Sequence, residues 1–93
     1  MEKQRIVILG AGESGVGAAI LAQKQGFDVF VSDFGAIADR YKETLVELNI
    51  AFEEKQHTVA SIVNASEVIK SPGIADSVSI IKELKKKNIP VIS

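Results

Sequence analysis

The feature that most constrains the fold is an alternation of short apolar runs with segments of helical spacing. Residues 6–9 (Ile-Val-Ile-Leu) form a continuous run rich in β-branched residues, which is typical of a strand buried on both faces. Further short runs follow at residues 29–31, 50–52, 68–69 and 90–92. Strands that alternate with helices are joined by right-handed crossovers, so the pattern predicts a parallel sheet.

Four segments between these runs place apolar residues on one helical face. Gly26 and Asn49 stand where the first two helices should end, Thr58 could cap the third, and Asp76 or Ser77 could cap the fourth. The inward positions are Val16, Ala19, Ile20 and Gln23; Ile37, Tyr41, Leu45 and Leu48; Val59, Ile62 and Val63; and Val78, Ile81 and Leu84.

These elements predict an α/β, Rossmann-like fold: a five-stranded parallel sheet of order 3-2-1-4-5 with helices on both faces. In such a sheet the ligand crevice lies at the carboxyl ends of the first and fourth strands, where the strand order reverses. The 93 residues suffice for one domain. Because the last strand is followed by no helix, we expect this domain to belong to a longer protein.

Composition excludes several classes of protein. The chain has no cysteine, which rules out disulfide scaffolds and thiolate metal sites, and its one histidine cannot form a histidine-based metal centre unaided. Eleven basic against twelve acidic residues argue against a nucleic-acid binder, and the Lys-Lys-Lys run at 85–87 suits the last turn of a helix. No apolar stretch could span a membrane and no signal peptide is present, so we expect a cytoplasmic protein without a membrane partner.

A glycine-rich loop directly joins the first strand to the first helix. Residues 10–15 (Gly-Ala-Gly-Glu-Ser-Gly) match the G-x-G-x-x-G pattern in the strand-to-helix context that gives the pattern meaning. Gly10 permits a tight turn, Gly12 lets a ligand approach the backbone, and Gly15 lets the helix pack close to the sheet, a packing face that Gly17 should continue. The first-turn N–H groups would then face an anion. The alternative is a tight turn that binds nothing.

Two further features follow the strands on either side of the first strand, at the same edge of the sheet. Asp33 follows the second strand, where a carboxylate can accept hydrogen bonds from a ribose or another ligand donor, or can simply begin a turn. Ser71, Pro72 and Gly73 follow the fourth strand and could offer backbone N–H groups to a phosphate, or form an ordinary loop.

Other polar residues suggest no catalytic set. The chain has no Gly-Lys pair and therefore no ATP-binding P-loop. His57 lies in a polar stretch and is predicted to be a solvated loop residue, as are Glu53 and Glu54.

Taken together, the glycine loop, Asp33 and the Ser-Pro-Gly-Ile segment at 71–74 resemble the N-terminal domain of the Mur ligases. The strongest points are residues 13–17 (Glu-Ser-Gly-Val-Gly) and 69–74 (Ile-Lys-Ser-Pro-Gly-Ile). The likeness covers essentially the whole chain, and is greatest to the branch that adds D-glutamate to UDP-N-acetylmuramoyl-L-alanine.

The resemblance implies a function and a set of site residues. In this family the N-terminal domain binds the UDP part of the substrate, while a central domain binds ATP and magnesium and a C-terminal domain helps to bind the amino acid. The chain would thus contain no cofactor and no catalytic residue of its own, and would work with its own central and C-terminal domains in cytoplasmic peptidoglycan synthesis. The implied UDP-binding residues are Gly12, Glu13, Ser14, Gly15, Asp33, Phe34, Ser71, Pro72 and Gly73. Phe34 and Gly35 depart from a more polar pair in some relatives, and we expect Phe34 to pack on the base.

Two other functions remain open from the residues. The same glycine loop and Asp33 fit an NAD-type dinucleotide-binding module of a dehydrogenase or regulator, although such folds usually need two mononucleotide halves. A flavodoxin-like domain without a small ligand is the third interpretation, and the turn at 71–73 argues against it.

Overall fold

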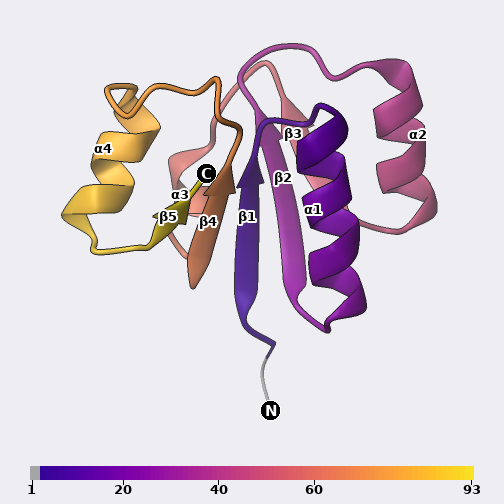
Figure 1. The fold of residues 1–93 in the computed structure, drawn as a ribbon, viewed down its shortest axis with the longest axis horizontal. Helices are drawn as coiled ribbons and strands as arrows, with labels where there is room; N and C mark the ends of the chain where they lie inside the picture. Colours follow the sequence, from indigo (N-terminus) through magenta and orange to yellow (C-terminus); the bar gives the residue numbers. More distant parts are fainter. Residues whose placement is uncertain (1–2) are drawn as a thin grey trace.

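The computed structural model describes residues 3–93, and Figure 1 shows strands and helices alternating along them. The elements are β1 (Arg5–Leu9), α1 (Glu13–Lys24), β2 (Asp28–Asp33), α2 (Asp39–Glu47), β3 (Ala51–Glu54), α3 (Val59–Ile62), β4 (Glu67–Lys70), α4 (Ser79–Lys86) and β5 (Val91–Ile92).

The five strands form one parallel sheet in the order β3-β2-β1-β4-β5, which confirms the prediction. β1 lies at the centre, where Val7 pairs with Phe30 of β2 on one side and with Val68 of β4 on the other. Because β1 and β4 are neighbours although two strands separate them in sequence, the chain changes direction across the sheet between them. Because of that reversal, the loops that follow β1 and β4 lead to opposite sides, and a crevice can form at the carboxyl ends of these two strands.

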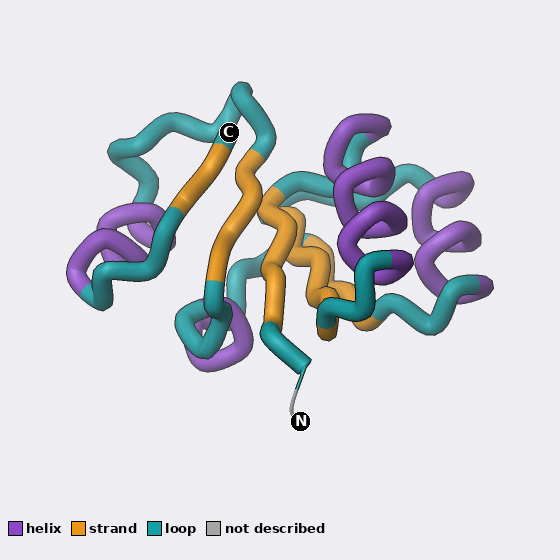
Figure 2. Tube along the Cα trace, turned by 60° about the horizontal axis from the view of Figure 1, so that its bottom comes forward, coloured by secondary structure: helices purple, strands orange, loops and turns teal. Residues whose placement is uncertain are grey.

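Two apolar cores cover the two faces of the sheet. Ile6 and Ile8 point into a core with α1 and α2, while Val7 and Leu9 point into a core with α3 and α4. Figure 2 shows the helices lying on both sides of the strands. The continuous apolar run of β1 is thus explained by burial on alternate faces.

The helix ends follow the predictions in part. Gly26 has a φ of 91° and Asn49 a φ of 57°, so both adopt the left-handed conformation that ends helices. Thr58 stands at the N-cap of α3 without a side-chain capping bond. The predicted caps Asp76 and Ser77 are wrong: α4 begins at Ser79 with Val78 at its N-cap, and the Asp76 carboxylate instead lies 3.8 Å from the Lys70 ammonium.

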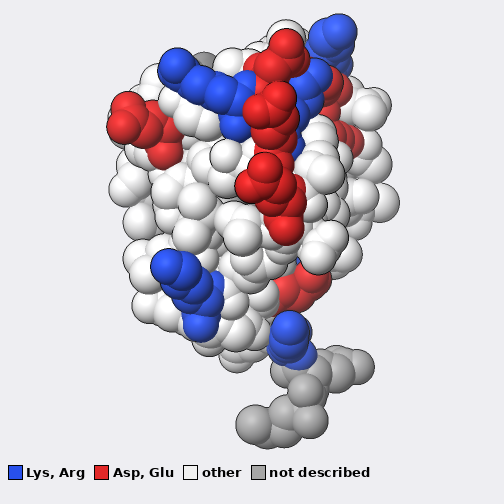
Figure 3. All heavy atoms as spheres, turned by 90° about the vertical axis from the view of Figure 1, so that its right-hand side faces the viewer, with Lys and Arg blue, Asp and Glu red and all other residues white. Residues whose placement is uncertain are grey.

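Charged side chains of both signs lie on the face that α2 occupies. Figure 3 looks at the side where α2 lies and shows acidic side chains flanked by basic ones, in keeping with the formal net charge of −1. Among the described residues, no helix is long and apolar enough to cross a membrane. The lysines at 85–87 occupy the last turn and C-cap of α4, as predicted.

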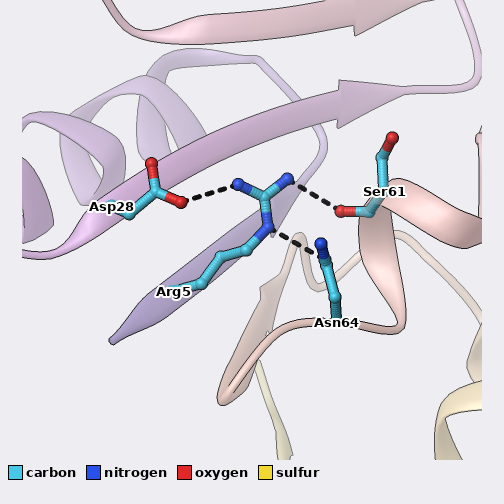
Figure 4. A network of polar contacts seen from close by, with 4 residues as sticks. All are labelled: Arg5, Asp28, Ser61 and Asn64. Atoms are coloured by element: carbon cyan, nitrogen blue, oxygen red, sulfur yellow. Dashed lines mark hydrogen bonds and ion pairs between the residues drawn. The ribbon is translucent and has the colours of Figure 1, made fainter. Parts of the chain in front are cut away.

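Arg5 ties the amino end of the sheet to the segment after α3 (Figure 4). Its guanidinium donates to Asp28 Oδ2 at 2.8 Å, to Asn64 Oδ1 at 2.9 Å and to the Ser61 carbonyl at 2.9 Å. It also lies 5.2 Å from the centre of the Phe30 ring. One side chain thus connects β1, β2 and the end of α3, on the edge opposite the glycine loop.

We expect Arg5→Met to lower the free energy of unfolding by about 1.5–3 kcal/mol, the range for hydrogen bonds to a charged group. Asp28→Asn should cost about 0–1 kcal/mol, because it weakens one exposed ion pair and leaves the Ser61 and Asn64 bonds in place. Urea denaturation of both variants measures the difference. Equal losses would show that the ion pair carries the whole effect.

Gly15 and Gly17 should respond oppositely to alanine. A Cβ on Gly15 would overlap the Gly10 carbonyl oxygen, whereas one on Gly17 meets no atom within 4 Å. Gly17 is exposed, so it does not continue the packing face as predicted. Gly15→Ala should therefore destabilise the domain, and Gly17→Ala should stabilise it by about 0.5–1 kcal/mol as a helix-interior replacement. Thermal unfolding followed by circular dichroism compares them; a Gly15→Ala protein as stable as the parent would contradict the close packing.

Candidate functional site

The glycine loop, the end of β2 and the turn at 71–73 meet at the carboxyl edge of the sheet. The Gly10 N–H donates to the Ser32 carbonyl at 2.9 Å, and the Ser71 N–H donates to the Leu9 carbonyl at 2.9 Å. Gly10 has a φ of 98°, and a Cβ there would lie 2.9 Å from the Ser71 Cβ. Glycine is thus required at this position by backbone conformation and by contact with the neighbouring turn.

The start of α1 leaves backbone donors open. Gly12 occupies the N-cap in an extended conformation and makes no side-chain capping bond. A helix cannot satisfy its own first N–H groups, and the helix dipole adds positive potential there. Gly12, Glu13 and Ser14 are all exposed, and no atom lies within 4 Å of a Cβ built on Gly12. The site can therefore receive an anion at the backbone.

A small hollow of about 160 Å³ separates this helix from the turn after β4. Ser14 and Gly15 line it from one side, and Ser71 and Pro72 from the other. Four of the predicted site residues are thus brought together around one space. Two hydroxyls and the open end of α1 make this space suitable for phosphate oxygens.

Asp33 is held by the loops on either side of it. Its Oδ2 accepts from the Ala11 N–H at 2.8 Å, and its Oδ1 accepts from the Gly35 N–H at 2.9 Å. The carboxylate therefore connects the glycine loop to the turn after β2. Each oxygen keeps a second lone pair, so the predicted contact with a ligand stays a prediction.

A larger groove of about 790 Å³ lies between the segments that follow β2 and β3 and the segment from Gly73 into α4. Phe34, which is 73% exposed, and Gly73 line this groove rather than the hollow. The other lining residues include His57 and Val59 near α3, and Ile74, Val78 and Ile80 before and within α4. Six of the predicted site residues thus line one of two separate spaces, while Gly12, Glu13 and Asp33 line neither.

The structure corrects the prediction that His57 is a solvated loop residue. It is half-buried rather than solvated, and its ring centre lies 5.6 Å from that of Phe34. Its Nδ1 lies 2.7 Å from the hydroxyl of Ser32, which is itself fully buried. The histidine is held here because the loop after β3 folds back over the end of β2.

Glu53 and Glu54 are also corrected, since both belong to β3 and not to a solvated loop. Glu53 accepts from the Ser32 hydroxyl and from the backbone and side chain of Thr58. On the other face of the sheet, Glu54 accepts from the Ile37 N–H and from the Lys42 ammonium, each at 2.9 Å. The two carboxylates therefore fasten the segments that follow β3 and β2.

Burial and hydrogen bonds lower the pKa values of His57, Glu53 and Glu54. Burial lowers the pKa of His57 below its ordinary value, against the opposing charges of Glu53 and Asp33. Partial burial would raise the pKa of Glu53, but the Thr58 and Ser32 hydrogen bonds and the His57 charge outweigh it and lower that pKa. The Ile37 N–H and then Lys42 lower the pKa of Glu54. At neutral pH the His57 imidazole on the groove wall is thus neutral, and the Glu53 and Glu54 carboxylates, which do not line the groove, are ionised.

Lys70 lies in the segment at 69–74, but its side chain was given no role in the sequence analysis. Its ammonium donates to the Ile74 carbonyl at 2.9 Å, and the residue is 9% exposed. A lysine this buried needs partners, and these partners hold the turn that carries Ser71 to Gly73.

The alternation of side chains along strands could have indicated that Ser32 and Glu53 lie close together. Ser32 and Glu53 are register partners in neighbouring parallel strands, so they share one face of the sheet. No comparable signal identifies His57, because its position depends on a loop. Among residues 3–93, no group of three or more metal-ligating side chains comes together.

Residues 4–93 match the family model of the Mur ligase MurD-like N-terminal domain. A UDP-N-acetylmuramoylalanine–D-glutamate ligase of Bacteroides thetaiotaomicron is 58% identical over 97% of this chain and 20% of its own length. The ligase of the same name from Porphyromonas gingivalis is 56% identical over 98% of the chain and likewise 20% of its length. The chain thus spans about a fifth of these curated relatives.

Solved structures agree on the fold. A UDP-N-acetylmuramate:L-alanyl-gamma-D-glutamyl-meso-diaminopimelate ligase from Neisseria meningitides superposes with a TM-score of 0.82 at 21% identity, covering 99% of this chain and 29% of that one. SirC, a precorrin-2 dehydrogenase, gives a TM-score of 0.70 at 12% identity over 97% of this chain and 44% of that one. The family match, over nearly every residue, shows that the chain belongs to the Mur ligases as a MurD-like N-terminal domain.

Proposed function

We propose that this chain binds the UDP moiety of UDP-N-acetylmuramoyl-L-alanine, for the ATP-dependent addition of D-glutamate in peptidoglycan precursor synthesis. The observation that carries the proposal is the meeting of two phosphate-type elements around one hollow: the open start of α1 and the turn at 71–73. The names of the relatives supply the substrate, a UDP-linked muramoylalanine.

The diphosphate and the uridine of the ligand would each contact a different part of the site. The diphosphate would lie against the first turn of α1 and the hydroxyls of Ser14 and Ser71, where backbone donors and the helix dipole favour negative charge. The uridine would extend toward Asp33 and into the groove, with its base against the exposed ring of Phe34.

The chemistry of the ligation is assigned to the rest of a longer protein. We propose that ATP and magnesium bind a central domain, and that a C-terminal domain receives the amino acid, both outside these residues. The role of this domain would be to hold the UDP end so that the muramoyl carboxylate reaches that centre, in the cytoplasm where the precursor is made.

A side chain at position 12 should reduce ligand binding by filling the space that the ligand enters, without lowering the stability of the fold. Gly12 is exposed and extended with nothing near a built Cβ, so Gly12→Val should leave the fold intact while filling the ligand approach. We expect it to abolish binding of UDP-N-acetylmuramoyl-L-alanine in an NMR titration of labelled protein. Gly17→Val is the matched control, since that glycine is equally unobstructed but lies one turn further along the helix. Binding that survives in Gly12→Val would contradict the loop assignment.

The same titration with NAD tests the dinucleotide alternative. Chemical-shift changes at Gly12 to Gly15, Asp33 and Ser71 to Gly73 with the UDP compound alone would support the proposal. Changes with NAD alone would overturn it in favour of a dinucleotide-binding module.

A further inference from the structure

Lys70 is a charged residue on an apolar face of the sheet. It stands two positions after Val68 in β4, so both side chains point to the same face, and Val68 belongs to the apolar core with α3 and α4. Among residues 3–93 only Ser32 and Lys70 are buried polar residues, and Lys70 alone is charged. Burial of a charge costs free energy, and an apolar side chain of similar size is often equally stable or more stable there. Stability of the fold therefore does not explain a lysine at this position.

The Lys70 ammonium binds the far end of the turn that follows it. It donates to the Ile74 carbonyl at 2.9 Å, and it lies 3.8 Å from the exposed carboxylate of Asp76. The Ile74 N–H in turn donates to the Ser71 carbonyl at 3.0 Å, so residues 71–74 form a β-turn. A hydrogen bond from a charged donor is roughly twice as strong as a neutral one. The residue before the turn thus holds the residue that ends it.

The two ends of this turn are held in different ways. At the first end the Ser71 N–H donates to the Leu9 carbonyl at 2.9 Å, which fixes the turn to β1. At the second end Ile74 approaches the glycine loop only by apolar contact, since its Cδ1 lies 3.7 Å from a Cβ built on Gly10. The hydrogen bond from Lys70 is therefore what holds the carbonyl of Ile74 in place.

The residues that this bond orders line the candidate site. Ser71 and Pro72 line the small hollow opposite the start of α1, and Gly73 and Ile74 line the larger groove. A binding loop that is already ordered before the ligand arrives loses less conformational freedom on binding, which increases affinity. The buried lysine thus orders a segment whose position matters for binding.

We propose that Lys70 is a positioning residue for the diphosphate of the ligand: by holding the Ile74 carbonyl it keeps the turn at 71–73 in place opposite the start of α1. Lys70 acts through the turn and does not itself contact the ligand. This inference rests on the proposed function, because it takes a phosphate group to lie beside this turn.

The first test is Lys70→Met, followed by NMR titration with UDP and by thermal unfolding. Methionine has an unbranched side chain of similar length without charge or donor, so it suits the apolar face, and the Ile74 carbonyl, in a partly buried residue, can accept from water instead. We expect the variant to unfold at or above the temperature of the parent. Its affinity for UDP should fall about 2- to 12-fold, the factor that corresponds to one hydrogen bond. A purely structural role would lower stability and leave the affinity of the folded protein unchanged.

Hydrogen exchange measures the order of the turn without any ligand. The Ile74 amide is bonded within the turn, whereas the amide of Val7 belongs to the central strand. In Lys70→Met the Ile74 amide should exchange faster and the Val7 amide at the rate of the parent, because only the turn opens more often. An Ile74 amide that keeps the exchange rate of the parent would overturn the inference.

Asp76→Asn is the matched control for charge, since removal of any nearby cation weakens binding of an anion. This variant adds one positive charge beside Lys70 and keeps the bond to the Ile74 carbonyl. Positioning predicts an affinity for UDP close to that of the parent. It also predicts that the parent-to-Lys70→Met affinity ratio persists from about 50 mM to about 500 mM salt. A charge effect alone would make Asp76→Asn gain as much affinity as Lys70→Met loses, and both differences would vanish at the higher salt concentration.

The outcomes distinguish this inference from the proposed function. If the unsubstituted chain binds no UDP, the proposed function fails and this inference with it. If the chain binds UDP and Lys70→Met binds it equally well, the role of Lys70 is overturned while UDP binding stands. A Lys70→Met chain that does not fold would show that the lysine serves the fold itself, and would overturn the role in the same way.

Discussion

The placement of β1 between β2 and β4 is the constraint on which the rest of the structure depends. Its side chains alternate between the two apolar cores, and its backbone pairs on both edges. This burial holds Gly10 against Ser71, and it positions the start of α1 beside the turn after β4. The hollow between those loops is therefore a consequence of strand order and close backbone packing more than of any single polar side chain.

Polar residues at the strand ends then determine what surrounds that hollow. Asp33 points toward the glycine loop, and Ser32 points to the opposite face, because successive residues of a strand alternate. The carboxylate thus fastens the loop that would meet phosphate, while the hydroxyl fastens the histidine of the groove. Adjacent residues in sequence support two different parts of one candidate site.

The fold could be predicted from the sequence because its signals are local and repeated. The apolar runs identify the strands, Gly26 and Asn49 mark helix ends, and the glycine loop identifies the central crossover. The start of α4 could not be predicted, since Asp76 is attracted to the buried Lys70 and leaves Val78 at the cap. The surroundings of His57 could not be predicted because they are created by contacts with Ser32 and Phe34, 25 and 23 positions earlier in the chain.

The division of the site into a hollow and a groove has a physical logic. Backbone donors at a helix terminus attract any phosphate, so they contribute affinity without distinguishing one nucleotide from another. Discrimination needs an acceptor or donor of fixed orientation next to the base, and a buried network supplies that orientation when all of its members are satisfied. Ser32, Glu53 and Thr58 are all hydrogen-bonded here. The open start of α1 and the hydrogen-bonded network around His57 thus lie at different parts of one sheet edge, and the proposed phosphate contact concerns only the first of them.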